Sequence, residues 1–215
     1  MPPPDERTDS AIVNSLLVVQ RDALLGLQRL VVGGKAFFDA DLPAQCVLFS
    51  NHTSHLDTTS MLAAIPRQLR GNTRPVAGLD YWGASALRRY IAHRLLNVVM
   101  INRASGGGDA LQPLQAALDK GHSLIVFPEG TRSQTTVPLP FKSGLFYLTA
   151  DRPHLALVPV YQENLHRALP KGAPFPLPLL CRSHFGAPLF NNQGEDKTAF
   201  LARARAAVCD LARHF

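Results

Sequence analysis

The stretch that decides the fold class is Cys46-Val47-Leu48-Phe49-Ser50-Asn51-His52-Thr53-Ser54-His55-Leu56-Asp57. Its first five residues form an apolar run that ends at turn residues, which predicts a buried strand. A helix is expected directly afterwards, from Asp57 to Ile65. Ser123–Phe127 is a second and clearer strand, again followed by a polar loop. Strands that alternate with helical stretches in this way are typical of α/β proteins.

The rest of the chain continues this alternation. Further strands are expected at Pro75–Leu79, Val98–Ile101 and Leu155–Val160, and further helices at Tyr81–Leu96, Ala110–Lys120, Gly144–Ala150 and Lys197–Arg213. The length of 215 residues suits one domain with a sizeable core. We therefore predict a single α/β domain with a mixed, largely parallel sheet flanked by helices.

The N-terminal region reads differently. Residues 1–9 are expected to form a disordered tail and residues 10–34 an amphipathic helix, with the main domain over residues 35–215. Polar residues recur every seven residues in the helix, in two series that form one stripe: Asn14, Arg21 and Gln28, and Ser15, Asp22 and Arg29. The other face is Leu, Val, Ile and Ala. It could pack onto the domain or lie among lipid headgroups, and the sequence leaves both interpretations open.

Composition limits the partners. The formal net charge is +6, which favours an anionic partner such as phosphate groups, an anionic membrane surface or an acidic carrier protein. No nucleic-acid partner is expected, because no basic motif interleaved with aromatic residues is present. A sequence cluster of arginines fits either a solvated basic face or a docking surface for anionic lipid: Arg67, Arg70, Arg74, Arg88, Arg89 and Arg94.

Compartment is also indicated. The three cysteines are far apart and form no CxxC pair, so neither a metal site nor a disulfide framework is predicted, and a reducing cytosolic compartment fits. The first residues lack the pattern of a signal peptide. No stretch of about eighteen uncharged apolar residues exists, so membrane contact is expected to be peripheral.

Two polar loops carry the candidate chemistry. In the first, His52 and Asp57 could act as a general base and the carboxylate that orients it. Such a pair can deprotonate a hydroxyl without any protein nucleophile, although H-x4-D alone is a common chance pattern. The second loop is Phe127-Pro128-Glu129-Gly130-Thr131-Arg132-Ser133. Here a carboxylate, a glycine and an arginine lie close enough to bind a polyol phosphate.

Together, N-H-x-S-H-x-D and F-P-E-G-T-R-S resemble the glycerolipid acyltransferase family, which includes lysophosphatidate and glycerol-3-phosphate acyltransferases. The resemblance runs from about Cys46 to Leu189. It includes three shorter segments in the same order: Ile101-Asn102-Arg103, Phe141-Lys142-Ser143-Gly144 and Val158-Pro159-Val160-Tyr161.

The resemblance implies a role for each matching residue. His52 would be the base and Asp57 its partner. The acceptor would be held by Arg103, Glu129, Gly130, Thr131 and Arg132, with Lys142 as a further phosphate ligand and Pro159 shaping the pocket. No metal or other cofactor is implied, since the acyl donor, acyl-CoA or acyl carrier protein, is itself a substrate.

The implied activity is transfer of a fatty acyl group to a hydroxyl of a glycerol-phosphate lipid precursor. The favoured acceptor is the lysophospholipid 1-acylglycerol-3-phosphate, which would give phosphatidic acid at the inner, cytoplasmic face of a membrane. Glycerol 3-phosphate and a lyso-aminolipid remain open as acceptors. A catalytically silent lipid-binding module is the alternative from another class. A lipase or thioesterase is disfavoured because G-x-S-x-G is absent.

Overall fold

The computed structural model describes residues 11–82, 85–102, 107–133, 135, 137–168, 177 and 179–214. The predicted tail over residues 1–9 lies outside this part of the chain.

The described strands form one seven-stranded sheet in the order β1-β7-β6-β2-β5-β3-β4. Their bounds are β1 Lys35–Phe38, β2 Cys46–Ser50, β3 Thr73–Gly78, β4 Val99–Ile101, β5 Ser123–Val126, β6 Ala156–Glu163 and β7 Arg182–Phe185. Neighbouring strands are parallel except β6 and β7, which are antiparallel. The prediction of a mixed, largely parallel sheet is confirmed.

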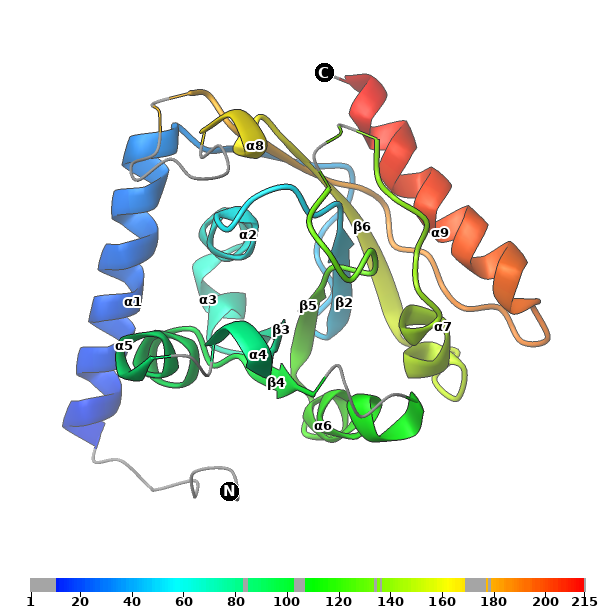
Figure 1. Ribbon diagram of the computed structural model, residues 1–215, viewed down its shortest axis with the longest axis horizontal. Helices are drawn as coiled ribbons and strands as arrows, with labels where there is room; N and C mark the ends of the chain where they lie inside the picture. The colour runs from blue at the N-terminus through cyan, green and yellow to red at the C-terminus, as the bar shows by residue number, and fades with distance from the viewer. Residues whose placement is uncertain are drawn as a thin grey trace.

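Helices cover both faces of this sheet (Figure 1). Their bounds are α1 Ala11–Val32, α2 Asp57–Ala64, α3 Arg67–Arg70, α4 Leu79–Trp82, α5 Ala86–Tyr90, α6 Gly107–Asp119, α7 Gly144–Thr149, α8 Leu165–Ala168 and α9 Lys197–Leu211. A π-helix, Ile91–Leu95, continues α5, and a 3-10 turn, Ala212–His214, follows α9. One hydrophobic cluster joins the sheet to α6, α7 and α9, and a second joins it to α1, α2 and the π-helix.

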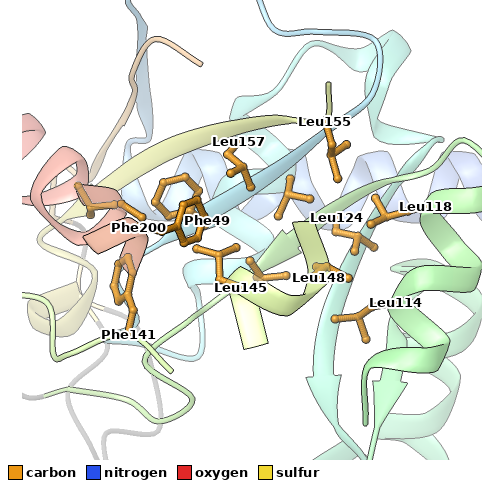
Figure 2. Packing of buried hydrophobic residues seen from close by; sticks show 14 of the residues in the cluster. Phe49, Leu114, Leu118, Leu124, Phe141, Leu145, Leu148, Leu155, Leu157 and Phe200 are labelled. Carbon is orange, nitrogen blue, oxygen red and sulfur yellow. The ribbon is translucent and has the colours of Figure 1, made fainter. Parts of the chain in front are cut away.

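Strand β2 shows why the sheet sits in the middle. All five of its residues are buried. Val47 and Phe49 pack into the cluster with α6, α7 and α9, whereas Cys46 and Leu48 pack into the cluster on the other face. Figure 2 shows Phe49 near Phe200 of α9 and Leu145 of α7, with Leu124 of β5 further along the same cluster. A strand buried on both faces must be apolar at every position, so it reads as a continuous run rather than an alternation.

Several elements differ from the sequence-based expectation. The helix predicted from Tyr81 to Leu96 is divided into α4, α5 and the π-helix. Helix α6 begins at Gly107, three residues before the predicted start at Ala110. Strands β1 and β7 were not predicted, because each has only four residues and β1 is largely exposed.

Helix α1 is present where it was predicted, and apolar residues lie on both of its faces. The side that meets the domain holds Arg21 and Gln28 of the polar stripe together with Leu25 and Val32. Leu17 and Leu24 also pack into the core on this side. The opposite side exposes large apolar side chains: Ile12, Val13, Leu16, Val18, Val19, Leu27 and Leu30. The apolar surface of the helix is thus divided between the domain core and the outside. No helix in the described ranges is both long and apolar enough to cross a membrane.

Polar contacts help to hold the inward side of α1 in place. Asp22 forms an ion pair with Arg67 of α3 at 2.8 Å and lies 3.7 Å from Arg70. Gln28 Nε2 donates to Ser60 Oγ of α2 at 2.6 Å. These polar contacts hold Asp22 and Gln28 against α3 and α2, next to the hydrophobic cluster that Leu25 shares with α2.

Candidate active site

The first polar loop forms a histidine–aspartate pair at the carboxyl end of β2. His52 Nδ1 lies 2.8 Å from Asp57 Oδ2. The same oxygen accepts backbone N–H bonds from Thr53 at 2.6 Å and Ser54 at 2.9 Å. Asp57 is fully buried at the start of α2. These donors favour the ionised carboxylate, so we assign the proton to Nδ1, which leaves Nε2 as the basic nitrogen.

The imidazole is held from two further directions. Its ring stacks on Phe127 with centroids 4.3 Å apart, and its side chain keeps 20% of its surface exposed. Asn51, the preceding residue, bonds to the main chain of Gln162 in both directions, at 3.0 Å and 2.8 Å. This amide extends the β2–β6 ladder by one rung beyond Ser50. These hydrogen bonds therefore hold the backbone in place directly before His52.

Glu129 joins the two polar loops. Its Oε1 accepts a hydrogen bond from the backbone N–H of His52 at 2.8 Å, and its Oε2 accepts one from Leu139 at 2.9 Å. The side chain is only 2% exposed. Burial raises the pKa of Glu129, and the two backbone donors act against that increase. The structure therefore places Glu129 as a positioning residue for His52, and its predicted role in holding the acceptor stays a prediction.

Backbone bonds complete the junction between the loops. Ser133 N donates to His52 O at 2.7 Å, and Lys142 N donates to Pro128 O at 2.8 Å. Gly130 has φ +69°, and a Cβ there would lie 2.7 Å from Lys142 Nζ. Glycine is thus favoured by the backbone conformation, and a side chain here would also have to displace the flexible end of Lys142.

Positive charge gathers beside the imidazole. His55 is exposed, and its pKa is lowered by partial desolvation, then by the positive charge of Arg132, with smaller effects from His52 and Arg88. Arg132 itself is exposed. The predicted acceptor arginine, Arg132, therefore shares one electropositive region with His55 next to His52, and sequence reasoning had assigned no site role to His55 or Arg88.

Two further predicted site residues, Thr131 and Pro159, lie in the part of the chain that the structure describes. Arg103 lies outside the described residues. Pro159 is in the middle of β6, paired with Phe49 of β2, where it supports the sheet. Thr131 is exposed in the loop after Glu129.

An apolar pocket of about 790 Å³ opens beside this loop. Pro128, Gly130 and Lys142 border it, and Leu111, Leu114 and Leu145 line its interior. Its walls come from strands β3, β4 and β5 and helices α6 and α7. No local sequence signal could have revealed it, because residues from five separate elements build it.

Comparisons with known proteins agree with this arrangement. The model of the Acyltransferase family matches residues 34–163. The 1-acyl-sn-glycerol-3-phosphate acyltransferase alpha proteins of Ovis aries and Homo sapiens are 33% identical over 154 residues, covering 69% of this chain and 50% of each relative. The chain thus spans about half the length of these curated relatives.

The fold is also found in a solved structure. The 1-acyl-sn-glycerophosphate (LPA) acyltransferase PlsC from Thermotoga maritima superposes with a TM-score of 0.73 at 18% identity, covering 96% of this chain and 83% of that one. From the family match, the sequence relatives and the shared fold, we conclude that this chain belongs to the glycerolipid acyltransferase family.

Proposed function

We propose that the chain transfers a fatty acyl group from a thioester, acyl-CoA or acyl carrier protein, to a hydroxyl of a glycerol-phosphate lipid precursor. The acceptor we favour is 1-acylglycerol-3-phosphate, which gives phosphatidic acid. The carrying observation is the His52–Asp57 pair, 2.8 Å apart, with the buried carboxylate held by two backbone donors. The names of the sequence relatives support the choice of acceptor.

The geometry fits direct transfer. His52 Nε2 takes the proton of the acceptor hydroxyl while the oxygen attacks the thioester carbonyl carbon. A C–O bond forms, the C–S bond breaks, and the thiolate leaves with the proton that His52 received. Asp57 stabilises the imidazolium between these steps. In the chemical step itself, His52 and Asp57 therefore hold and move one proton.

The acceptor phosphate is assigned to the electropositive region of Arg132, His55 and Arg88. Arginine suits this position because its planar guanidinium binds phosphate oxygens in pairs and stays charged. A phosphate there would place the rest of a glycerol backbone within reach of the neighbouring imidazole.

The fatty chain of the donor is assigned to the apolar pocket. Its volume and its leucine lining suit an alkyl chain, and its border at Pro128 and Gly130 lies on the loop that Glu129 joins to His52. A chain held there would present its carbonyl to this loop.

We further propose that α1 docks the protein on an anionic membrane at the cytoplasmic face. The outward stripe leaves Leu30 81% and Ile12 73% exposed. Burying a leucine stabilises by about 1.5–3 kcal/mol, so a few of these side chains suffice for reversible binding. Net positive charge adds attraction to anionic lipid. The three free thiols fit a reducing compartment.

An acyl-transfer assay tests the activity. Purified protein is incubated with palmitoyl-CoA or palmitoyl–acyl carrier protein and with lysophosphatidate, glycerol 3-phosphate or a lyso-aminolipid. We expect phosphatidic acid from lysophosphatidate, and no product from the His52→Ala variant. Transfer only to an acceptor that lacks phosphate would overturn the acceptor assignment. Binding of vesicles without transfer to any acceptor would favour the silent lipid-binding module.

A further inference from the structure

A polar pocket of about 380 Å³ lies next to the catalytic loop and has no part in the mechanism above. Asn51 and Thr53, the residues on either side of His52, line it, although His52 does not. Its other walls are the carboxyl end of β6, Asn164, helix α8, the C-terminal part of α9 with the turn after it, and Val137 and Pro138. The first polar loop therefore borders this space directly.

Three buried oxygens of side chains that line the pocket lack a hydrogen bond within the described residues: Thr53 Oγ1, Gln162 Oε1 and Glu163 Oε2. Gln162 is 2% exposed, and its Nε2 donates to Ser50 Oγ at 3.3 Å. Its Oε1 has no hydrogen-bond partner within the described part of the chain, and the same holds for Thr53 Oγ1. Leaving buried oxygens unsatisfied is costly, and native structures rarely do so. A ligand that supplies N–H or O–H groups would satisfy the oxygens of Thr53 and Gln162.

The charges indicate which kind of donor fits. Glu163 lines the pocket, but its Oε2 already lies 3.5 Å from Arg182 Nη1. His166 and the exposed Arg167 line the pocket as well. A cationic ligand would find the Glu163 carboxylate already paired with Arg182. A ligand with neutral N–H or O–H donors and an anionic end would meet the free oxygens and Arg167.

We propose that this pocket binds the 4′-phosphopantetheine arm of the acyl donor, the part that acyl-CoA and acyl carrier protein share. This inference rests on the proposed function. The amide N–H groups and hydroxyl of the arm meet the oxygens of Gln162 and Thr53. Its dimethyl group lies against Val137 and Pro138, and its phosphate lies near Arg167.

The positions of the two pockets support this assignment. Val137 and Pro138 line the polar pocket, while Pro128, Gly130 and Lys142 line the apolar one. These residues of the two pockets belong to one segment of the chain, in which Glu129 and Ser133 hydrogen-bond to the backbone of His52. A donor with its arm in one pocket and its fatty chain in the other has its thioester between them, beside the imidazole.

The acceptor does not need this space. Its phosphate is assigned to Arg132 and His55, and neither residue lines the polar pocket. The two substrates would then approach His52 from different sides, as direct transfer without a covalent enzyme intermediate requires.

Steady-state kinetics with one acyl group on three thiols tests the proposal. The donors are palmitoyl-CoA, palmitoyl–acyl carrier protein and S-palmitoyl-2-mercaptoethanol, which lacks the arm. The variants are Gln162→Met and Val137→Trp, the latter at a loop position that is 58% exposed and tolerates a larger side chain. Gln193→Met, at an exposed position outside both pockets, is the matched control.

We expect Gln162→Met to raise KM for the CoA and carrier-protein donors by about two- to tenfold, the loss that one hydrogen bond accounts for. Val137→Trp should raise the same two KM values because its larger side chain takes up space in the pocket. KM for the mercaptoethanol thioester and for lysophosphatidate should be unchanged, and Gln193→Met should match wild type. Arg167→Ala should raise KM for palmitoyl-CoA but not for S-palmitoyl-pantetheine, which has no phosphate.

Several outcomes would overturn the proposal. An equal loss on the mercaptoethanol thioester means that the pocket only supports the fold. A raised KM for lysophosphatidate assigns the pocket to the acceptor. An effect limited to palmitoyl-CoA assigns it to the nucleotide. If the wild-type protein transfers from no donor at all, the proposed function fails instead. This result differs from the three outcomes above, in which the wild-type protein is active.

Discussion

The β2–α2 segment and helix α1 treat polar residues in opposite ways. In the first, apolar residues fill the sheet and polar groups gather at its carboxyl end, where Asp57 and Asn51 have their partners. In the second, Arg21 is buried and Leu30 is exposed. Both segments obey the same rule, because each face packs against the surface that matches it. The difference is that α1 meets the domain through polar and apolar residues together and leaves an apolar surface outside, whereas β2 is enclosed by the core on both faces.

Breaking the catalytic pair should give the largest effect. His52→Ala should lower kcat by at least about a hundredfold, the usual contribution of a general base, with the fold retained. Asp57→Asn should also be severe, because the amide favours the wrong tautomer of the imidazole. Steady-state kinetics and thermal unfolding measure both. The control is Asp151→Asn at an exposed loop position. Activity of His52→Ala within a few-fold of wild type would contradict the mechanism.

Next in size is the polar face of α1. Asp22→Ala leaves the buried Arg21 and the partly buried Arg70 without their carboxylate. We expect the free energy of unfolding in urea to fall by about 2–3 kcal/mol, between the values for exposed and fully buried ion pairs. Asp151→Ala should change it by less than about 0.5 kcal/mol. No loss in Asp22→Ala would mean that α1 does not pack through its polar stripe.

Glu129 tests the junction between the loops. In Glu129→Gln, an amide N–H₂ replaces one oxygen that accepts a backbone N–H, from either His52 or Leu139. A stability loss of about 1–3 kcal/mol is expected, since a buried donor loses its partner. Because the substitution displaces the His52 backbone, kcat should fall for every acceptor. An effect on acceptor KM alone would instead support Glu129 as an acceptor ligand.

The outward face of α1 should matter little for stability. Leu16→Ser combined with Leu30→Ser should change the free energy of unfolding by less than about 0.5 kcal/mol, because both side chains are exposed. Leu25→Ser, at a buried position of the same helix, should be strongly destabilising. Flotation with anionic vesicles should show weaker binding by the outward double variant. Equal flotation of this variant and wild type would remove α1 as the membrane contact.

The smallest expected change concerns His55, which lies in the loop between β2 and α2. Desolvation and then Arg132 lower its pKa from 6.5. Removing the positive charge in Arg132→Ala should therefore raise the pKa of His55 towards 6.5, as NMR titration of its ring protons can show. His55→Gln identifies the signal. An unchanged pKa would place Arg132 away from the acceptor site.

Much of the fold and the reactive pair could be predicted from local sequence. The strand Cys46–Ser50 is apolar at each core position, and His52 and Asp57 are close enough in the chain to meet across one turn. The family followed from two long motifs. Strand β7 escaped prediction because polar Arg182, Ser183 and His184 acquire strand geometry only through their neighbours β1 and β6.

By itself, the sequence determined that this chain is an α/β acyltransferase-family protein with a histidine–aspartate pair after a buried strand. Those features depend on residues close together in the chain or on the period of apolar side chains. Tertiary structure alone decided that Glu129 bonds to the His52 backbone, 77 positions away, and that α1 holds Arg21 against the domain while Leu30 stays exposed. It also decided where the two pockets lie. Each of these depends on which distant surfaces meet, and no local pattern encodes the polarity of a surface assembled from separate elements.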